Sequence, residues 1–352
     1  MMERVVDGSM GEGGGQVIRT ALSLAALGGF PLRLENIRAG RSKPGLLRQH
    51  LTGLQALQRI CGGEIEGGQL GSTSVRAHFG APTGGEFDLQ IGSAGSTTLV
   101  LQTIVWPLLF AKGPSTVRIE GGTHNGGAPV VDFLTQSWLP LMRQMGARVN
   151  IRLEKYGFYP AGGGAIVVKV EPSELQPLSV LEAGPTLERR VLVVVSGNTS
   201  ERHLDELRAA LAVHQTWGQA ALRVQNVSRP MGPGLAIITT DECERVSRTL
   251  SELPERGARP VELLLKSLRM HDSLGRREIP VCEHLADQLL LPMVLAGGGS
   301  FRTTALSLHS TTNAQLLEQL TGCRVTSRAD GDAVRVDVTG ASAADVPWGV
   351  HA

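Results

Sequence analysis

The chain has few cysteines and no long apolar run. Its four cysteines, Cys61, Cys243, Cys282 and Cys323, lie far apart and form no CxxC pair. This argues against a zinc site, a redox motif and a disulfide framework. No apolar run approaches the ~20 residues that span a bilayer, and the opening residues MMERVVDG lack the apolar core of a signal peptide. We therefore expect a soluble cytoplasmic protein with no membrane association.

The chain also lacks a large excess of either charge. Its formal net charge is +1 over 352 residues, so any nucleic-acid site must be a local cluster rather than a global field. Of the 34 basic residues, 29 are arginine, and arginine suits bidentate phosphate contacts. A chain of this length can form two domains, or one elaborated domain, around a large core.

Two common phosphate-binding motifs are missing. Residues 7–24, DGSMGEGGGQVIRTALSL, place glycines ahead of a helix, so backbone N–H groups could face an anion there. The pair GK occurs nowhere, which excludes a P-loop, and no strong strand–turn–helix unit of the dinucleotide-binding type surrounds the glycines. The loop instead contains Glu12, with Arg19 two helical turns later. These residues alone leave open an anion site or a tight turn that caps a buried helix.

A repeat is visible in the spacing of glycines. Gly28 and Gly113 end similar helical segments about 85 residues apart, and Gly62 and Gly146 repeat the same interval in a second set of segments. Third copies of both segments follow, but roughly 92 to 100 residues later than this period requires. The spacing predicts three βαβα-type units with a domain inserted ahead of the third.

These patterns predict an α+β protein. Repeat units one and two of a large domain are predicted at 1–183, and an inserted small α/β domain at 184–277. The third repeat unit of the large domain follows at 278–340, and a C-terminal tail at 341–352. Within the insert we expect strands at RVLVVVSG and LAIITTD, a helix opened by Ser200, and helices near 241–253 and 261–270.

Three polar segments are candidate site-forming turns. IRAGRSKPGLLRQH gathers Arg38, Arg41, Lys43 and Arg48 around a Pro-Gly turn that opens a helix, where an anion could bind. EFDLQIGSAGSTTLVLQT and GGTHNGGAPVVDF are two further glycine-rich turns between strand and helix. Such turns on equivalent units could rim one cleft, although each alone is weak evidence and a solvated loop edge is an equally simple explanation for the basic segment.

His309 and Asp287 are the candidate reactive pair. The pattern places His309 at the end of the strand FRTTALSLH, where a histidine often has only a structural role. Asp287 lies in the apolar helix EHLADQLLLP and needs a polar partner. An aspartate that orients an imidazole is one such pairing, and it leaves the other ring nitrogen free as a nucleophile.

Five ordered blocks carry a family resemblance. Residues 7–24, IRAGRSKPGLLRQHL, IGSAGSTTLVLQT, GFYPAGGG and HLADQLLLPMVLAGGG make the chain similar to bacterial RNA 3′-terminal phosphate cyclases across nearly its whole length. The resemblance implies three repeated two-helix, four-stranded units with an inserted thioredoxin-like domain. It also implies an ATP-dependent ligase that converts an RNA 3′-phosphate to a 2′,3′-cyclic phosphodiester.

The resemblance further implies roles for particular residues. His309 would accept AMP, and Asp287 would orient it. The residues that the resemblance implies for ATP binding are Gln102, His284, Asp287, Val131 and Arg19. Those implied for binding phosphate or RNA are Arg38, Arg41 and Gln49. Glu12 would bind Mg²⁺ (or Mn²⁺). The implied partners are ATP and RNA with a 3′-phosphate end, with no obligate protein partner. Because this pocket uses no residue of 184–277, we expect the insert to be dispensable for self-adenylation.

The chain departs from the family at two positions of the adenine site. His284 stands where relatives carry a stacking tyrosine, and Val131 stands where they carry a proline. Two other classes remain as alternatives: a catalytically inactive cyclase-like factor for RNA processing or ribosome assembly, and a carboxyvinyl transferase of similar architecture. His309 argues against both, because neither needs a histidine nucleophile. The absence of Lys-x-Asp-Gly, with VVDG in its place, also favours histidine.

Overall fold

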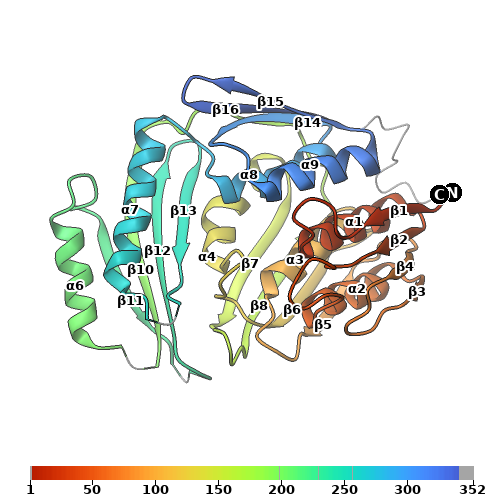
Figure 1. Cartoon of the computed structure of the whole chain (residues 1–352), viewed down its shortest axis with the longest axis horizontal. Helices are drawn as coiled ribbons and strands as arrows, with labels where there is room; N and C mark the ends of the chain where they lie inside the picture. The colour runs from red at the N-terminus through yellow and green to blue at the C-terminus, as the bar shows by residue number, and fades with distance from the viewer. Residues whose placement is uncertain (1, 198, 229, 256, 341–352) are drawn as a thin grey trace.

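The computed structural model describes residues 2–197, 199–228, 230–255 and 257–340 (Figure 1). The tail predicted at 341–352 lies outside the described residues. The helices are α1 (Gly15–Gly28), α2 (Arg48–Cys61), α3 (Thr97–Leu109), α4 (Val131–Phe133), the π-helix η1 (Leu134–Trp138), α5 (Leu139–Gln144), α6 (Glu201–Ala212), α7 (Pro260–Arg276), α8 (Glu283–Leu295) and α9 (Leu308–Thr321).

The described strands form four sheets of four strands each. The first sheet contains β1 (Arg4–Asp7), β2 (Leu32–Glu35), β4 (Val75–His78) and β3 (Glu64–Glu66). The second contains β5 (Gly85–Gln90), β6 (Ser115–Gly121), β8 (Gly164–Glu171) and β7 (Arg148–Lys155). The third contains β9 (Leu178–Val180), β14 (Gly298–Thr303), β16 (Ala333–Thr339) and β15 (Arg324–Asp330).

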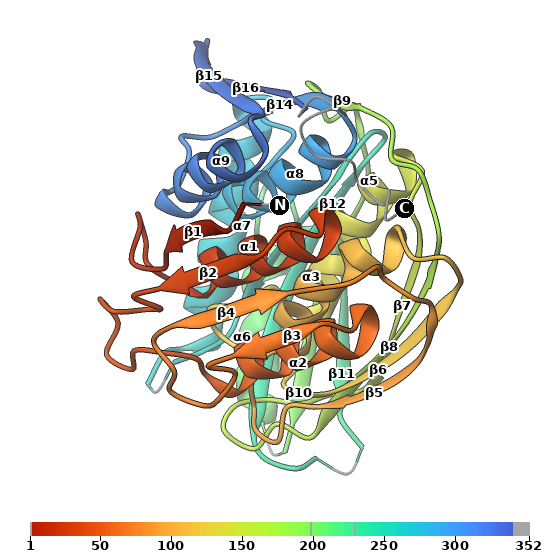
Figure 2. The same ribbon diagram turned by 90° about the vertical axis from the view of Figure 1, so that its right-hand side faces the viewer.

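These three sheets have the same internal arrangement. In each, the first two strands of the unit pair in parallel, the second pairs antiparallel with the last, and the last pairs antiparallel with the third. A helix precedes the second strand of each sheet and another helical segment follows it. Figure 2 shows the first sheet face-on, with α1 and α2 behind it.

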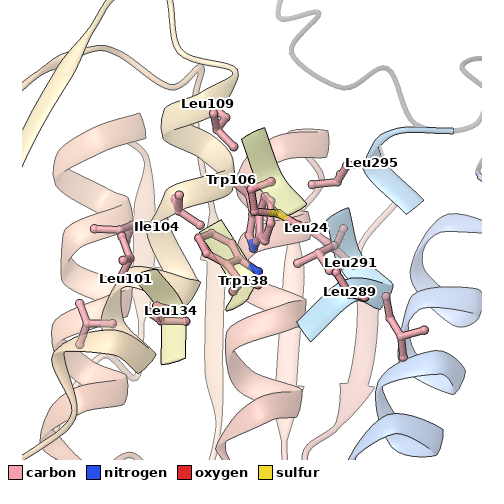
Figure 3. Close-up of a cluster of buried hydrophobic side chains, with 14 of the residues drawn as sticks. Leu24, Leu101, Ile104, Trp106, Leu109, Leu134, Trp138, Leu289, Leu291 and Leu295 are labelled. Atoms are coloured by element: carbon pink, nitrogen blue, oxygen red, sulfur yellow. The ribbon is translucent and has the colours of Figure 1, made fainter. Parts of the chain in front are cut away.

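The helices of the three sheets meet in a common apolar core. Figure 3 shows leucines of α1, α3 and α8 packed around two tryptophans. Trp106 of α3 and Trp138 of η1 pack edge to face, with ring centroids 5.9 Å apart. Because α1, α3, α8 and η1 are anchored in this core, the loops at the helix ends occupy fixed positions relative to one another.

The fourth sheet belongs to a smaller unit at the left of Figure 1. It contains β11 (Ala221–Asn226), β10 (Thr186–Ser196), β12 (Gly234–Cys243) and β13 (Ser247–Glu252). The helix expected near 241–253 is wrong, because β12 and β13 form an antiparallel hairpin there, with Ile237 opposite Glu252 and Glu242 opposite Ser247. The apolar residues of this segment are buried in a β-hairpin and not on one face of a helix.

The α+β class predicted from the sequence is confirmed by these mixed sheets and helices. The assignment of the sheets to three repeats and an inserted thioredoxin-like domain stays a prediction. Within the described part of the chain, no helix is both long and apolar enough to cross a membrane.

Candidate active site

His309 lies in the first turn of α9 and not at the end of a strand, as the sequence pattern suggested. β14 ends at Thr303, and Ser307 caps α9 by accepting a hydrogen bond from the backbone N–H of Ser310 at 3.1 Å. The serine forms a standard helix N-cap and so fixes the start of α9 just ahead of the histidine. The His309 side chain is 56% exposed, so its ring is open to a substrate.

A carboxylate and an amide oxygen from the N-terminal loop and α1 face one nitrogen of the His309 ring. Nδ1 of His309 lies 2.8 Å from Oε2 of Glu12 and 3.2 Å from Oε1 of Gln16. Both neighbours are hydrogen-bond acceptors, so in the neutral ring the proton is on Nδ1. Nε2 is then the unprotonated nitrogen and can act as a nucleophile.

Asp287 reaches His309 through Gln16. The amide nitrogen of Gln16 donates to Oδ1 of Asp287, which turns the Gln16 oxygen toward the imidazole. A direct Asp287–His309 hydrogen bond, as the sequence suggested, is not present among the described residues. The reason is that the side chain of Gln16 lies between them, and Glu12 takes the place of the direct carboxylate partner. Sequence spacing gave no signal for Gln16.

The surroundings of Asp287 disfavour its charge. Burial raises the pKa of Asp287, against the opposing effects of the Gln16 hydrogen bond and the Arg19 charge. Burial likewise lowers the pKa of Arg19 to about 10, which the attraction of Asp287 partly offsets. Asn313 Nδ2 also lies 3.4 Å from Asp287 Oδ1. The carboxylate is thus enclosed by donors that fix its position.

A cleft of about 350 Å³ opens beside these groups. It brings together four of the predicted residues, Arg19, His284, Asp287 and His309. Gln102 lines an adjoining hollow that also includes Arg19 and Asp287, and its amide nitrogen donates to Gln288. The predicted nucleotide residues therefore come together from helices associated with three sheets: α1 with the first, α3 with the second, and α8 and α9 with the third.

Val131 does not line this cleft. Its side chain is 2% exposed and packs in the core at the start of α4. Ala128, Pro129 and Phe133 line the cleft in that region instead. The helix start turns the Val131 side chain inward and leaves the preceding loop on the surface, so a Val131–nucleotide contact stays a prediction that the lining of the cleft does not support.

The smaller unit contributes to the same cleft. Thr249, Ser251, Glu252 and Leu253, in and just after β13, are lining residues. The expectation that no residue of 184–277 belongs to the pocket is therefore wrong. The error arose because a helix was expected where β13 forms. This strand packs against α4 and η1 and so places these residues at the edge of the cleft.

The basic block at residues 37–50 approaches the site from the other side. Arg41 forms an ion pair with Oε1 of Glu12, and its Nη2 also donates to the Glu12 carbonyl at 3.1 Å. Arg38, with a φ of +56°, donates from Nε and Nη2 to the carbonyl oxygen of Lys43 at 3.3 Å. Burial, with Arg19 and Arg38 nearby, lowers the pKa of His50 to about 3, so this unpredicted neighbour stays neutral.

Gln49 occupies a separate position from the rest of the predicted phosphate residues. Its Oε1 accepts from the backbone N–H of Ser96 at 2.9 Å. It lines a second, larger cleft together with Ser96, and it does not line the cleft of His309.

The donor set around Glu12 fits only one kind of metal site. Within the described residues, no group of three or more His, Cys, Asp or Glu side chains is arranged to hold a metal ion. Mg²⁺ is commonly held by one or two carboxylates together with substrate phosphates. Glu12 fits this arrangement as a single protein ligand. Gly11, with a φ of +54°, packs against Thr312, and the Glu12 N–H donates to the Thr312 hydroxyl at 3.1 Å, which holds the Glu12 backbone against α9.

The sequence of the chain is similar to that of a known protein family. The family model described as RNA 3'-terminal phosphate cyclase matches residues 10–327. A protein of Ectopseudomonas mendocina (strain ymp) named RNA 3′-terminal phosphate cyclase is 41% identical over 337 residues, covering 95% of this chain and 97% of the relative. Proteins of the same name from Salmonella enteritidis PT4 (strain P125109) and Koribacter versatilis (strain Ellin345) are 40% and 38% identical, covering 95% and 89% of this chain and 99% and 88% of the relatives.

Identity at this level over nearly the full length of several relatives is decisive for the family. The relatives are named as enzymes, which confirms the prediction that the chain is one. Because both the family match and the relatives cover far more than half of the chain, we conclude that this protein belongs to the RNA 3′-terminal phosphate cyclase family.

Proposed function

We propose that the protein converts an RNA 3′-terminal phosphate to a 2′,3′-cyclic phosphodiester at the expense of ATP, with His309 as the nucleophile. The observation that supports this most is the pair of acceptors, Glu12 and Gln16, on Nδ1 of His309. They hold the ring in the tautomer whose Nε2 carries a lone pair, and the ring is exposed beside the cleft.

The proposed reaction has three steps, and in each one a bond forms as another breaks. Nε2 of His309 attacks the α-phosphorus of ATP, the P–N bond forms and pyrophosphate leaves. An oxygen of the RNA 3′-phosphate then attacks the same phosphorus, the P–N bond breaks and RNA(3′)pp(5′)A forms. Finally the 2′-hydroxyl attacks the RNA phosphorus, loses its proton, closes the ring and expels AMP. The last step is intramolecular, so proximity supplies much of its rate.

Individual residues receive roles within this scheme. Asp287 is a positioning residue that acts through Gln16, and His284 and Arg19 bind the nucleotide in the cleft that both line. Arg38 and Arg41 bind phosphate groups, and Gln49 contacts the RNA. Glu12 is the proposed protein ligand of Mg²⁺ (or Mn²⁺), which supplies positive charge to the triphosphate when bound.

The proposed architecture is three repeat units with an insert at 184–277. Support comes from the identical strand arrangement of the first three sheets and from the different order of the fourth, β11-β10-β12-β13. RNA and ATP as substrates, and a cytoplasmic location, belong to the same proposal.

An adenylation assay tests the nucleophile. The protein is incubated with α-labelled ATP and Mg²⁺, and the label should become covalently attached, survive alkali and be released by mild acid, as expected for a phosphorus–nitrogen bond. His309→Ala should form no adduct, while His203→Ala, which changes an exposed histidine on α6, should form it normally. An adduct that persists in His309→Ala would refute the mechanism.

The final step can be tested separately. His309→Ala should still cyclise, at least in part, an RNA supplied as the 3′-adenylate, because this step needs positioning and not the nucleophile. A catalytically inactive cyclase-like factor would fail in both assays, even with the wild-type sequence.

A further inference from the structure

A second cleft adjoins the one beside His309. Its volume is about 910 Å³, and it lies between the second sheet's loops and the smaller unit. The two clefts share the lining residues Leu99, Asn125, Gly126, Gly127, Ala128 and Leu253. A molecule in the second cleft can therefore extend one end directly to the group held at His309.

The second cleft differs sharply from its neighbour in charge. Among its described lining residues, Glu255 is the only one with a charged side chain. The arginines lie outside it, with Arg19 in the His309 cleft and Arg41 on Glu12. A phosphate group is therefore favoured at the arginines, and an uncharged group is favoured in the second cleft.

An exposed aromatic ring stands at the second cleft. Tyr159 is a lining residue and is 76% exposed, whereas the neighbouring Phe158 is 6% exposed. Phe158 packs so closely on Gly234 that a side chain at position 234 would clash with its ring. This contact joins the loop between β7 and β8 to the smaller unit. The Tyr159 ring is left largely open to solvent by the described residues, and exposed aromatic rings are the usual stacking partners of unpaired RNA bases.

A polar group at the boundary of the two clefts suits a ribose. The Asn125 amide nitrogen donates to the carbonyl of Ala94, which fixes the orientation of the amide. Its Oδ1 has no hydrogen-bond partner in the part of the chain that the structure describes. The Oδ1 atom is itself buried, so a ribose hydroxyl can bind it only if the amide shifts toward the clefts, both of which Asn125 lines.

We propose that the 3′-terminal nucleoside of the RNA binds in this second cleft, with its base stacked on Tyr159 and its ribose beside Asn125. This inference rests on the proposed function, and it identifies where the second substrate of the same site binds. The 3′-phosphate then lies toward His309 and the arginines, while the neutral base and sugar fill the cleft that no arginine lines.

A double-mutant cycle between protein and substrate tests this site. One component is Tyr159→Ala, with Tyr159→Phe as the control that keeps the ring. The other is a 3′-phosphorylated oligoribonucleotide whose terminal nucleotide is abasic, compared with the intact RNA. Loss of a base–aromatic stack corresponds to a change of about tenfold or more. Tyr159→Ala should lower kcat/KM for the intact RNA by this factor, and Tyr159→Phe should not.

The abasic RNA should react as weakly with wild type as with Tyr159→Ala, since the stack is already absent. Self-adenylation from ATP should be unchanged in Tyr159→Ala, which shows that the variant is folded. An equal effect of the substitution on both RNAs, or no effect on either, would overturn the nucleoside site.

The same cycle measured as equilibrium RNA binding separates the two proposals. Wild type that fails to cyclise RNA, yet shows the Tyr159–base coupling in binding, would reject the proposed chemistry and retain the nucleoside site. Cyclisation of RNA without any Tyr159–base coupling would retain the proposed chemistry and reject the nucleoside site.

Discussion

Oε2 of Glu12, in the loop before α1, lies 2.8 Å from Nδ1 of His309, near the start of α9. The two residues come from opposite ends of the sequence and from units built on different sheets. Their contact depends on the packing of α1 against α9, which places the glycine-rich loop over the first turn of α9.

The link from Asp287 through Gln16 predicts a tautomer effect. In Asp287→Asn, the new amide group can donate to Gln16 and turn the Gln16 nitrogen toward His309, which leaves Glu12 as the one remaining acceptor on Nδ1 and weakens the preference for the reactive tautomer. The adenylation rate should fall by roughly 100-fold or more, with ATP binding little changed. Glu283→Gln is a matched control, because Glu283 lies one turn earlier on α8 and lines the same cleft. Equal rate losses in both variants, or an unchanged pH profile in Asp287→Asn, would contradict the positioning role.

The position of Glu12 predicts a change in metal dependence. Glu12→Gln keeps an acceptor for His309 but removes the charge that would attract a divalent cation. The Mg²⁺ concentration for half-maximal adenylation should rise by about tenfold or more, and saturating Mg²⁺ should restore part of the rate. Glu12→Ala should recover less, since it also removes the acceptor. A Mg²⁺ titration of both variants measures this, and an unchanged midpoint in Glu12→Gln would exclude Glu12 as a ligand.

His284 is expected to form one wall of the nucleotide site. It is exposed, lines the cleft and lies one helical turn before Asp287. His284→Ala should raise the KM for ATP by roughly fivefold or more, because a stacking surface is lost. His284→Tyr should keep or improve ATP affinity. If the alanine variant binds ATP as well as wild type, the stacking role is wrong; His203→Ala serves as the exposed-histidine control.

The smaller unit is predicted to support nucleotide binding. Leu253, which follows β13, lines the cleft of His309. Leu253→Ala should raise the KM for ATP by roughly fivefold, since apolar contact with the nucleotide is removed. Leu187→Ala changes a leucine of the same unit that is 65% exposed and lines neither cleft, and it should leave KM unchanged. Identical kinetics for the two variants would restore the idea that the smaller unit is dispensable.

His50 is expected to limit stability in acid. Burial, with Arg19 and Arg38, lowers its folded pKa to about 3, whereas an unfolded histidine titrates near ~6.5. The unfolded state therefore binds this proton first, so the free energy of unfolding falls as the pH drops from about 6.5 toward 3. His50→Asn, which retains an acceptor for the Leu47 N–H, should flatten this dependence. Denaturant unfolding at several pH values measures it, with His203→Asn as the exposed control; parallel curves for His50→Asn and wild type would contradict the assignment.

Local periodicity and the order of the motifs were sufficient to predict several helices and the family, although the hairpin of β12 and β13 was mistaken for a helix. The helical periodicity around residues 15–28 and the glycine after it predicted α1, because a buried face and a left-handed helix end leave a clear local pattern. Five ordered motif blocks were sufficient for the family, which the comparisons then confirmed. Arg19, His284, Asp287 and His309 were predicted as site residues, and the structure brings these four to one cleft.

The groups that touch His309, and the parts of the chain that surround the cleft, follow from long-range packing. Gln16 lies between Asp287 and His309, and Glu12 reaches the imidazole, because helices from different sheets pack together; no local pattern encodes such contacts. The same holds for Leu253, which reaches the cleft through β13, and for Val131, which a helix start turns into the core. These contacts depend on long-range packing, which is set by the shape of whole buried surfaces rather than by spacing along the chain.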